Sequence, residues 1–282
     1  MPELPEVEGF RRRLAPLIVG RRLVRLHVRD PKLWRPAAGL TDGAVAGQAV
    51  LALERRAKLL IFSLSAELSL VAHLKIAGQL VYAWPDGRRI VGGHPYPLPD
   101  ADLPGAATRF VLDFEPDGGV ATGSAAPDGE GGTLFVNDQR RFAWLRLLPA
   151  AEVPAFVAAQ RYGPDPLDPT FTPAVLGARL QARRGRPVKA ALLDQTCVAG
   201  LGNIYVDEAL HGAQLHPMRR AGSLSESHVA RLHESIRRVL EVAVPVGGAL
   251  VKVGRAIQDV ASGRDFLRAH GRAGEACLTC LA

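Results

Sequence analysis

Seven short segments between residues 21 and 145 are rich in β-branched and aromatic residues, and several alternate polar with apolar positions. They read LVRLHV, AVLALE, LLIFSL, LSLVAHL, QLVYAW, RFVLDF and TLFVND. Clusters of Gly, Pro and Asp separate them, as expected for short strands joined by turns. This pattern predicts a β-sandwich or barrel. Residues 92–107 fit the pattern least and are expected to form a surface loop.

Helical periodicity is found on both sides of the strands. Residues 3–19 repeat apolar side chains at helical spacing, and after Pro149 four further stretches do so, at 173–183, 187–198, 203–212 and 225–244. We therefore expect an α+β protein. Its predicted parts are an N-terminal β domain, a linker, a helical domain and a short C-terminal segment, at residues 1–149, 150–169, 170–262 and 263–282.

The composition narrows the class of protein. Of the 282 residues, 48% are hydrophobic and 22% charged, which is typical of a folded globular chain. No uncharged apolar run reaches the ~18 residues of a membrane span. Three cysteines suit a reducing compartment, and the early Glu3, Glu6 and Glu8 are unlike a signal peptide. We expect a cytoplasmic monomer that does not bind membranes.

Charge is distributed unevenly along the chain. The formal net charge is +7, with Lys and Arg in excess in residues 1–60 and 131–282 and acidic residues in excess in residues 61–130. Two basic blocks flanking an acidic one favour a polyanionic partner on selected surfaces. An arginine-rich composition without functional meaning explains the same totals.

The first residues offer unusual chemistry. Removal of the initiator Met would expose the secondary amine of Pro2, and an α-amino group has a pKa of ~7.7–8.0, well below that of lysine. Attack of such an amine on a sugar C1′ gives an iminium, and the adjacent Glu3 can move a proton. Alternatively, Pro2 only starts a helix and Glu3 complements its dipole.

Two basic turns add candidates. Lys58 lies in Arg55-Arg56-Ala57-Lys58 before a predicted strand, and it suits either a proton donor or a phosphate contact. Arg140, Arg141 and Phe142 follow another strand, where an aromatic wedge and a guanidinium can enter a base stack. The alternatives are a solvated surface lysine and a hairpin whose Phe142 packs into the core.

A longer string joins two predicted helices, with Lys189, Asp194, Gln195 and then Val-Ala-Gly-Leu-Gly-Asn-Ile-Tyr at 198–205. One helix is expected to end at Gly200 and the next to begin near Asn203. Gly200 and Gly202 would let backbone N–H groups approach a phosphate, and Asn203 would cap the second helix. This order is typical of a helix–two-turn–helix motif.

Taken together, these strings resemble the formamidopyrimidine-DNA glycosylase family. PELPEVE, RRAK, HLxxxG, DxRRF, GPDPL, the VAGLGNIY string and GRAGEACxxC occur in the family's order from Pro2 to Cys280. The resemblance implies a DNA-repair enzyme that binds double-stranded DNA and excises oxidised purines, with abasic-site lyase activity. It implies base flipping and chemistry that requires no cofactor.

The resemblance also implies residue roles. Pro2 matches the Schiff-base nucleophile, Glu3 the proton donor for base release, Glu6 a supporting acid at the helix start, and Lys58 the proton donor for elimination. Arg140 and Phe142 match the residues that fill the void left by a flipped-out nucleotide, and Ile76 takes the place of an intercalating side chain. Phosphate contacts are matched by Lys189, Asn203 and Tyr205, and a basic DNA-binding position by Arg184. Lys252 resembles a residue of the base-recognition segment.

The chain departs from the family pattern at three places. The family's zinc finger has two C-x2-C pairs, whereas here Cys277 and Cys280 form one pair and an incomplete zinc site, with His270 a candidate third ligand. The finger's arginine for DNA binding and δ-elimination has no match. Ile76 and Lys75 replace a methionine and a glycine, and the histidine expected before RFVLDF is absent.

Two functions therefore stay open. One is a bifunctional glycosylase and lyase, favoured by Pro2, Glu3, Lys58 and Asn203. The other is a protein that binds lesions or abasic sites with little or no catalysis, favoured by the departures. A phosphate-binding metabolic enzyme is disfavoured because neither a Walker nor a dinucleotide-binding loop is present.

Overall fold

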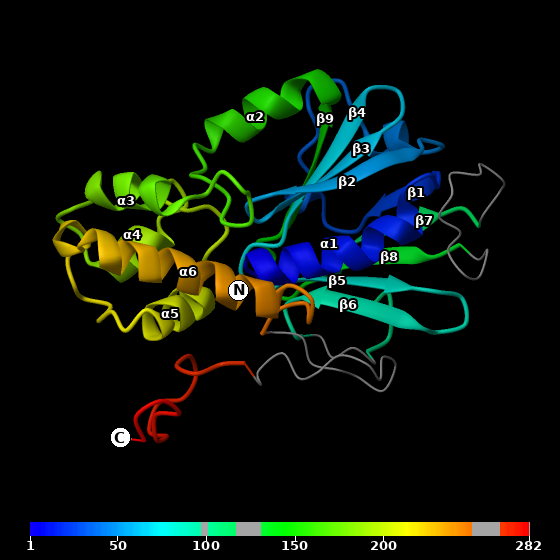
Figure 1. Cartoon of the computed structure of the whole chain (residues 1–282). Coiled ribbons are helices and arrows are strands. Elements are labelled where there is room, and N and C mark those ends of the chain that lie inside the picture. Colours follow the sequence, from blue (N-terminus) through cyan, green and yellow to red (C-terminus); the bar gives the residue numbers. More distant parts are fainter. Residues whose placement is uncertain (97–100, 117–130, 250–265, 282) are drawn as a thin grey trace.

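The computed structural model describes residues 1–96, 101–116, 131–249 and 266–281. It places two antiparallel sheets at one end of the molecule and a group of helices at the other (Figure 1). One sheet has the strand order β1-β7-β8-β5-β6 and the other β2-β3-β4-β9. The strands are β1 Leu23–Val28, β2 Val50–Arg56, β3 Leu59–Leu64, β4 Leu68–His73, β5 Gly78–Ala83, β6 Arg89–Gly93, β7 Thr108–Phe114, β8 Thr133–Asp138 and β9 Trp144–Pro149.

The predicted α+β fold with an N-terminal β-sandwich is confirmed. The alternating strands bury one set of side chains between the sheets, among them Phe62, Leu80 and Phe110. The seven predicted strand segments all form strands. Two more strands, β6 and β9, were not predicted from the sequence.

Strand β6 was missed because its Gly92 and Gly93 were interpreted as the start of a loop. The structure gives another reason for the first of them. A Cβ on Gly92 would lie 2.4 Å from a ring carbon of Phe10, so glycine allows the strand to pack against the N-terminal helix.

The helices follow the predicted order with one addition. They are α1 Leu4–Ile18, α2 Val153–Ala159, α3 Pro173–Gln181, α4 Val188–Leu193, α5 Asn203–Gly212 and α6 Glu226–Ala243, with short 3₁₀ turns at Pro31–Leu33, Asp42–Val45, Ala150–Glu152 and Ala221–Ser223. Helix α2 lies within residues 150–169, where a linker was expected. Within the described part of the chain, no helix is sufficiently long and apolar to cross a membrane.

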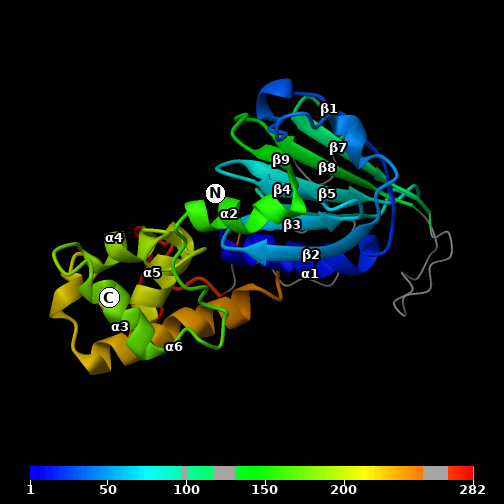
Figure 2. The ribbon, with the colours of Figure 1, turned by 90° about the horizontal axis from the view of Figure 1, so that it is seen from above.

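Helix α1 connects the two halves. Its Leu4 belongs to the apolar core of the helical part, whereas Val7 and Phe10 belong to the core of the sandwich. Figure 2 shows, from above, α1 running along the sheets, with α3 to α6 set apart on its N-terminal side. The first turn of α1 therefore lies where the two domains meet.

Helix α4 is shorter than predicted, ending at Leu193 rather than at Gly200. Beyond Leu193, polar side chains and not helical backbone bonds pair with the backbone N–H and C=O groups. Asp194 Oδ1 accepts from Thr196 N at 2.9 Å, and Gln195 accepts from Gly200 N at 2.9 Å while it donates to Leu201 O at 2.8 Å. Residues 194–202 therefore form a compact turn before α5.

Candidate active site at the domain junction

The N-terminal turn of α1 forms the centre of the site. Glu3 and Glu6 make a capping box, in which Glu3 N donates to Glu6 Oε2 at 2.9 Å. Both carboxyl groups are buried, with 2% and 0% of the residue exposed. Pro2 is buried beside them, and Leu4 N donates to Gly200 O at 3.0 Å across the domain junction.

The Glu3 side chain meets the start of α5. Its Oε1 accepts from Ile204 N at 3.1 Å, whereas Oε2 is buried without a hydrogen-bond partner among the described residues. Burial raises the pKa of Glu3 to about 7, against the opposing effects of Lys58 and of the N–H groups of Ile204 and Gly202. A carboxyl with this pKa can donate a proton near neutral pH.

Gly200 and Gly202 allow the turn before α5 to pack closely against the first residues of α1. A Cβ on Gly202 would lie 2.4 Å from Glu3 Cδ, and one on Gly200, at φ +90°, would lie 2.8 Å from Leu4 Cβ. Gly202, not Asn203, is the N-cap of α5. The expectation that Asn203 caps the helix was therefore wrong. The N–H groups of both glycines are used within the protein, that of Gly200 by Gln195 at 2.9 Å and that of Gly202 by Glu3, so the expected phosphate contacts are not present here.

Lys58 approaches the same turn from the sheet side. It lies in the two-residue turn between β2 and β3, after Ala57 in the left-handed region at φ 55°. The residue is buried, and burial lowers the pKa of its ammonium group, although Glu3 and Glu6 oppose the shift. Lys58 therefore loses its proton more readily than an exposed lysine.

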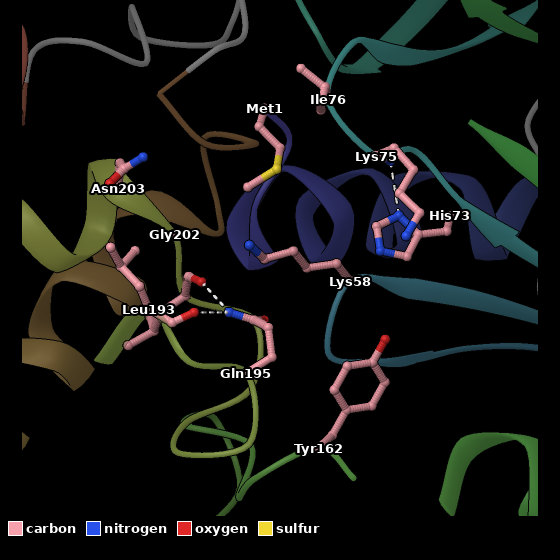
Figure 3. Close-up of a pocket in the computed structure, with 11 residues that line it drawn as sticks. Met1, Lys58, His73, Lys75, Ile76, Tyr162, Leu193, Gln195, Gly202 and Asn203 are labelled. Atoms are coloured by element: carbon pink, nitrogen blue, oxygen red, sulfur yellow. Dashed lines mark hydrogen bonds between the residues drawn. The ribbon is translucent and has the colours of Figure 1, made fainter. Parts of the chain in front are cut away.

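A pocket of about 260 Å³ opens where these elements meet. Figure 3 shows Lys58 reaching toward the first turn of α1, with His73, Lys75 and Ile76 on one side and Gln195, Gly202 and Asn203 on the other. Met1 lines this pocket, and burial lowers the pKa of its ammonium group, against the opposing effect of Glu3. The chain terminus thus lies in a pocket with an acid and an amine nearby.

The turn between β8 and β9 presents Arg140 and Phe142 outward. The buried Asp138 carboxylate organises it, accepting from Arg140 N at 2.9 Å, Phe142 N at 2.7 Å and Ala143 N at 2.6 Å. Phe142 is 47% exposed, and the Arg140 guanidinium lies 5.4 Å from its ring centroid. Phe142 is therefore not a core residue.

Ile76 is 37% exposed on a second turn, between β4 and β5. Lys75, where the sequence departs from the family's glycine, adopts φ 52° in the left-handed region. Its N–H donates to His73 Nδ1 at 2.8 Å, which holds the turn in this conformation.

Comparison with known proteins identifies the family. Residues 1–145 match the formamidopyrimidine-DNA glycosylase N-terminal domain, and residues 162–254 match the formamidopyrimidine-DNA glycosylase H2TH domain. The chain belongs to the formamidopyrimidine-DNA glycosylase family. This family membership supports a glycosylase that acts on damaged DNA.

Relatives match along nearly the whole chain. The formamidopyrimidine-DNA glycosylase of Symbiobacterium thermophilum is 40% identical over 99% of this chain and 82% of its own length, and that of Cereibacter sphaeroides is 39% identical over 99% and 91%. A Lactococcus lactis FPG mutant, solved in complex with a Fapy-dG containing DNA, superposes with a TM-score of 0.81 at 28% identity, over 100% of this chain and 92% of that one.

The other residues expected to contact DNA in a formamidopyrimidine-DNA glycosylase have different surroundings. Asn203 and Arg184 are exposed, and Lys189 pairs with Asp207 at 2.6 Å. Tyr205 is 1% exposed, and its hydroxyl donates to Glu6 Oε1 at 2.6 Å. A side chain buried in this way does not reach a phosphate, so this expectation was wrong. Lys252 lies outside the described residues.

Within the described residues, the fold does not bring further metal ligands to Cys277 and Cys280, the incomplete zinc site of this glycosylase family member. Cys277 Sγ lies 3.7 Å from His211 Nε2, but no group of three or more His, Cys, Asp or Glu suited to a metal occurs in the described ranges. His270, the candidate third ligand, interacts with Asp207 at 3.1 Å instead. The residues present do not fit a tetrahedral zinc ion.

Several pocket residues were given no functional role from the sequence, among them His73, Tyr162 and Gln195. His73 is the first residue of the HLxxxG string, so the sequence contained a signal that could have identified it. Burial lowers the pKa of His73 to about 3, with Lys75 and Lys58 adding to the shift, so its imidazole is neutral and can accept the Lys75 N–H. Tyr162 and Gln195 enter the pocket only through the packing of the two domains.

Proposed function

We propose that this chain is a DNA glycosylase and abasic-site lyase that excises oxidised purines, including 8-oxoguanine and formamidopyrimidines, from double-stranded DNA. The observation that carries the proposal is the buried carboxyl of Glu3, with a pKa near 7, beside the chain terminus and Lys58. Relatives bound to lesion-containing and abasic-site DNA support DNA as the substrate.

Removal of Met1 would leave the Pro2 amine in the pocket. Its nitrogen would attack C1′ of an everted nucleotide while the C1′–N bond to the base breaks, and Glu3 would protonate the departing base. The first product is an ammonium in which Pro2 is bonded to C1′. Its N–H proton then passes to O4′ as the C1′–O4′ bond breaks, which opens the sugar and leaves an iminium between Pro2 and C1′. Glu6, which accepts the Glu3 N–H, would hold the donor in place.

The iminium would then make the C2′ proton acidic. Loss of that proton and departure of the 3′ phosphate complete a β-elimination. Lys58 is suited to be the proton donor in this step, because burial has lowered the pKa of its ammonium group. The exposed Phe142 and Arg140 would fill the gap left by the everted nucleotide, offsetting the unstacking cost of a few kcal/mol. Ile76, Lys189, Asn203 and Arg184 would contact the DNA around it.

Borohydride trapping tests the proposal. We expect a duplex carrying 8-oxoguanine or an abasic site to form a covalent adduct with the processed chain, and no adduct when Met1 is retained by an N-terminal extension. Glu3→Gln should lower 8-oxoguanine excision at least ~100-fold, whereas the matched variant Glu152→Gln, at an exposed position, should not. Tight binding without adduct or excision would instead show a lesion-binding protein with little catalysis.

A further inference from the structure

The buried phenol of Tyr205 links two parts of the chain that are far apart in sequence. Its hydroxyl donates to Glu6 Oε1 at 2.6 Å and accepts from Ala249 N at 2.9 Å. Glu6 belongs to the first turn of α1, and Ala249 to the segment that follows α6. Each of the two hydrogen-bonding capacities of this hydroxyl is used within the protein.

The same segment packs directly onto α1. A Cβ on Gly248, at φ +87°, would lie 2.2 Å from Glu6 Oε1, and a Cβ on Gly9 would lie 2.6 Å from Gly247 Cα. Only glycine permits so close an approach of backbone to carboxylate. The residues 247–249 therefore form a seat for the Glu6 side chain, with Tyr205 completing it.

A continuous set of hydrogen bonds leads from this seat to the proton donor. Ala249 N donates to Tyr205, Tyr205 to Glu6, and Glu6 accepts the Glu3 N–H. We propose that Tyr205 is a positioning residue, which couples the docking of residues 247–249 to the placement of the Glu3 carboxyl for base release. This inference rests on the proposed function.

The coupling has a direction that follows from the surrounding charges. Glu3 is faced by Glu6 and the chain terminus, by Lys58 from the β2–β3 turn, and by the N–H groups at the start of α5. The Tyr205 hydroxyl stabilises the charged form of Glu6. Without it Glu6 would be charged less readily, its repulsion of a Glu3 carboxylate would weaken, and the pKa of Glu3 would fall.

Tyr205→Phe tests the inference in the full chain. We expect single-turnover excision of 8-oxoguanine to fall about tenfold, whereas cleavage of a preformed abasic site, which needs no base protonation, should change less than about threefold. The alkaline limb of the excision profile should move to lower pH. Tyr82→Phe makes the same change at a buried site in β5. It should leave the excision rate, the abasic-site cleavage rate and the alkaline limb unchanged.

A second variant approaches the seat from the other side. Gly248→Ala would push residues 247–249 away from Glu6, so it should give the same split between excision and abasic-site cleavage. Gly39→Ala is its matched control, because Gly39 also has a left-handed φ of +79° but nothing within 4 Å of the added Cβ. If Tyr205→Phe fails to fold, Gly248→Ala decides.

The outcomes separate the two proposals. An active wild-type chain whose Tyr205→Phe variant keeps its ratio of excision to abasic-site cleavage and its pH limb would overturn the positioning role alone, as would equal losses in both reactions. A wild-type chain that releases no base would overturn the proposed function together with this inference.

Discussion

The surroundings of Glu3 act on the pKa of its carboxyl in two directions. Burial and the neighbouring Glu6 raise this pKa to about 7, while Lys58 and two backbone N–H groups limit the rise. A general acid works when protonated, so its activity should be full below this pKa and should decline as the pH rises through about 7. Because the folded-state pKa exceeds the ordinary value of 4.5, the same group stabilises the fold below pH 4.5 and loses that contribution as the pH rises toward about 7.

The prediction is a descending limb near pH 7 in single-turnover excision of 8-oxoguanine. Glu3→Gln, which removes the titrating group, should leave only slow excision that lacks this limb. Abasic-site cleavage by the same variant provides the comparison. A wild-type profile that stays flat from pH 6 to pH 8 would contradict the assignment of Glu3 as proton donor.

The turn that precedes α5 sets the position of the Glu3 carboxyl. Gly202 has φ −140°, which any residue adopts, so Gly202→Ala tests contact and not backbone strain. Because the new Cβ would lie 2.4 Å from Glu3 Cδ, we expect excision to fall at least ~10-fold, as measured in single turnover. Gly185→Ala, with nothing within 4 Å, should retain wild-type excision. Unchanged excision in Gly202→Ala would mean that this contact does not place Glu3.

The β8–β9 turn depends on one carboxylate. Asp138→Asn would replace an oxygen that accepts two N–H groups by an amide donor, so we expect a loss of about 1–3 kcal/mol in the free energy of unfolding. Excision of a stacked lesion should fall as the Phe142 turn loosens. Asp42→Asn, at an exposed position, is the control. Denaturant unfolding and excision assays measure both effects, and an unaltered midpoint would refute the structural role.

The sequence predicted elements better than it predicted their edges and partners. The seven strand segments and the residues of α1 were predicted because alternation and helical spacing are local properties. Helix α4 ends earlier than predicted because the side chains of Asp194 and Gln195 hydrogen-bond the nearby backbone. Strand β6 was not predicted because Gly92 suggested a loop, whereas glycine is needed there to make room for the Phe10 ring. Tyr205 was misassigned because its bonds to Glu6 and Ala249 join residues more than 40 positions away.

At the scale of the whole molecule, a buried ion cluster holds the domains together. Arg55 at the end of β2 contacts Glu8 of α1 at 3.0 Å and Asp165 before α3 at 2.8 Å, and the arginine and Glu8 side chains are each 7% exposed. Despite its burial, Glu8 has a pKa lowered to about 2, chiefly because Arg11 and Arg12 donate hydrogen bonds to it. Its stabilising contribution is present above pH 4.5 and is lost as the pH falls toward 2.

Removing Arg55 should therefore be costly. Arg55→Ala removes the arginine that bridges Glu8 and Asp165, while Glu8 keeps its bonds from Arg11 and Arg12. We therefore expect a loss of about 1.5–3 kcal/mol in the free energy of unfolding. Arg25→Ala breaks the exposed pair with Asp113 and should cost at most about 1 kcal/mol. Equal midpoints for the two variants in urea unfolding at pH 7 would contradict the role of the cluster.

In the proposed mechanism, the amine of Pro2, freed by removal of Met1, is the nucleophile. The most direct measurement is peptide mapping by mass spectrometry of the adduct formed when borohydride reduces the complex with abasic-site DNA. We predict a single modified peptide, with the reduced sugar attached to the nitrogen of Pro2. Attachment to Lys58 or another lysine, or an adduct that forms equally well with Met1 retained, would contradict the account.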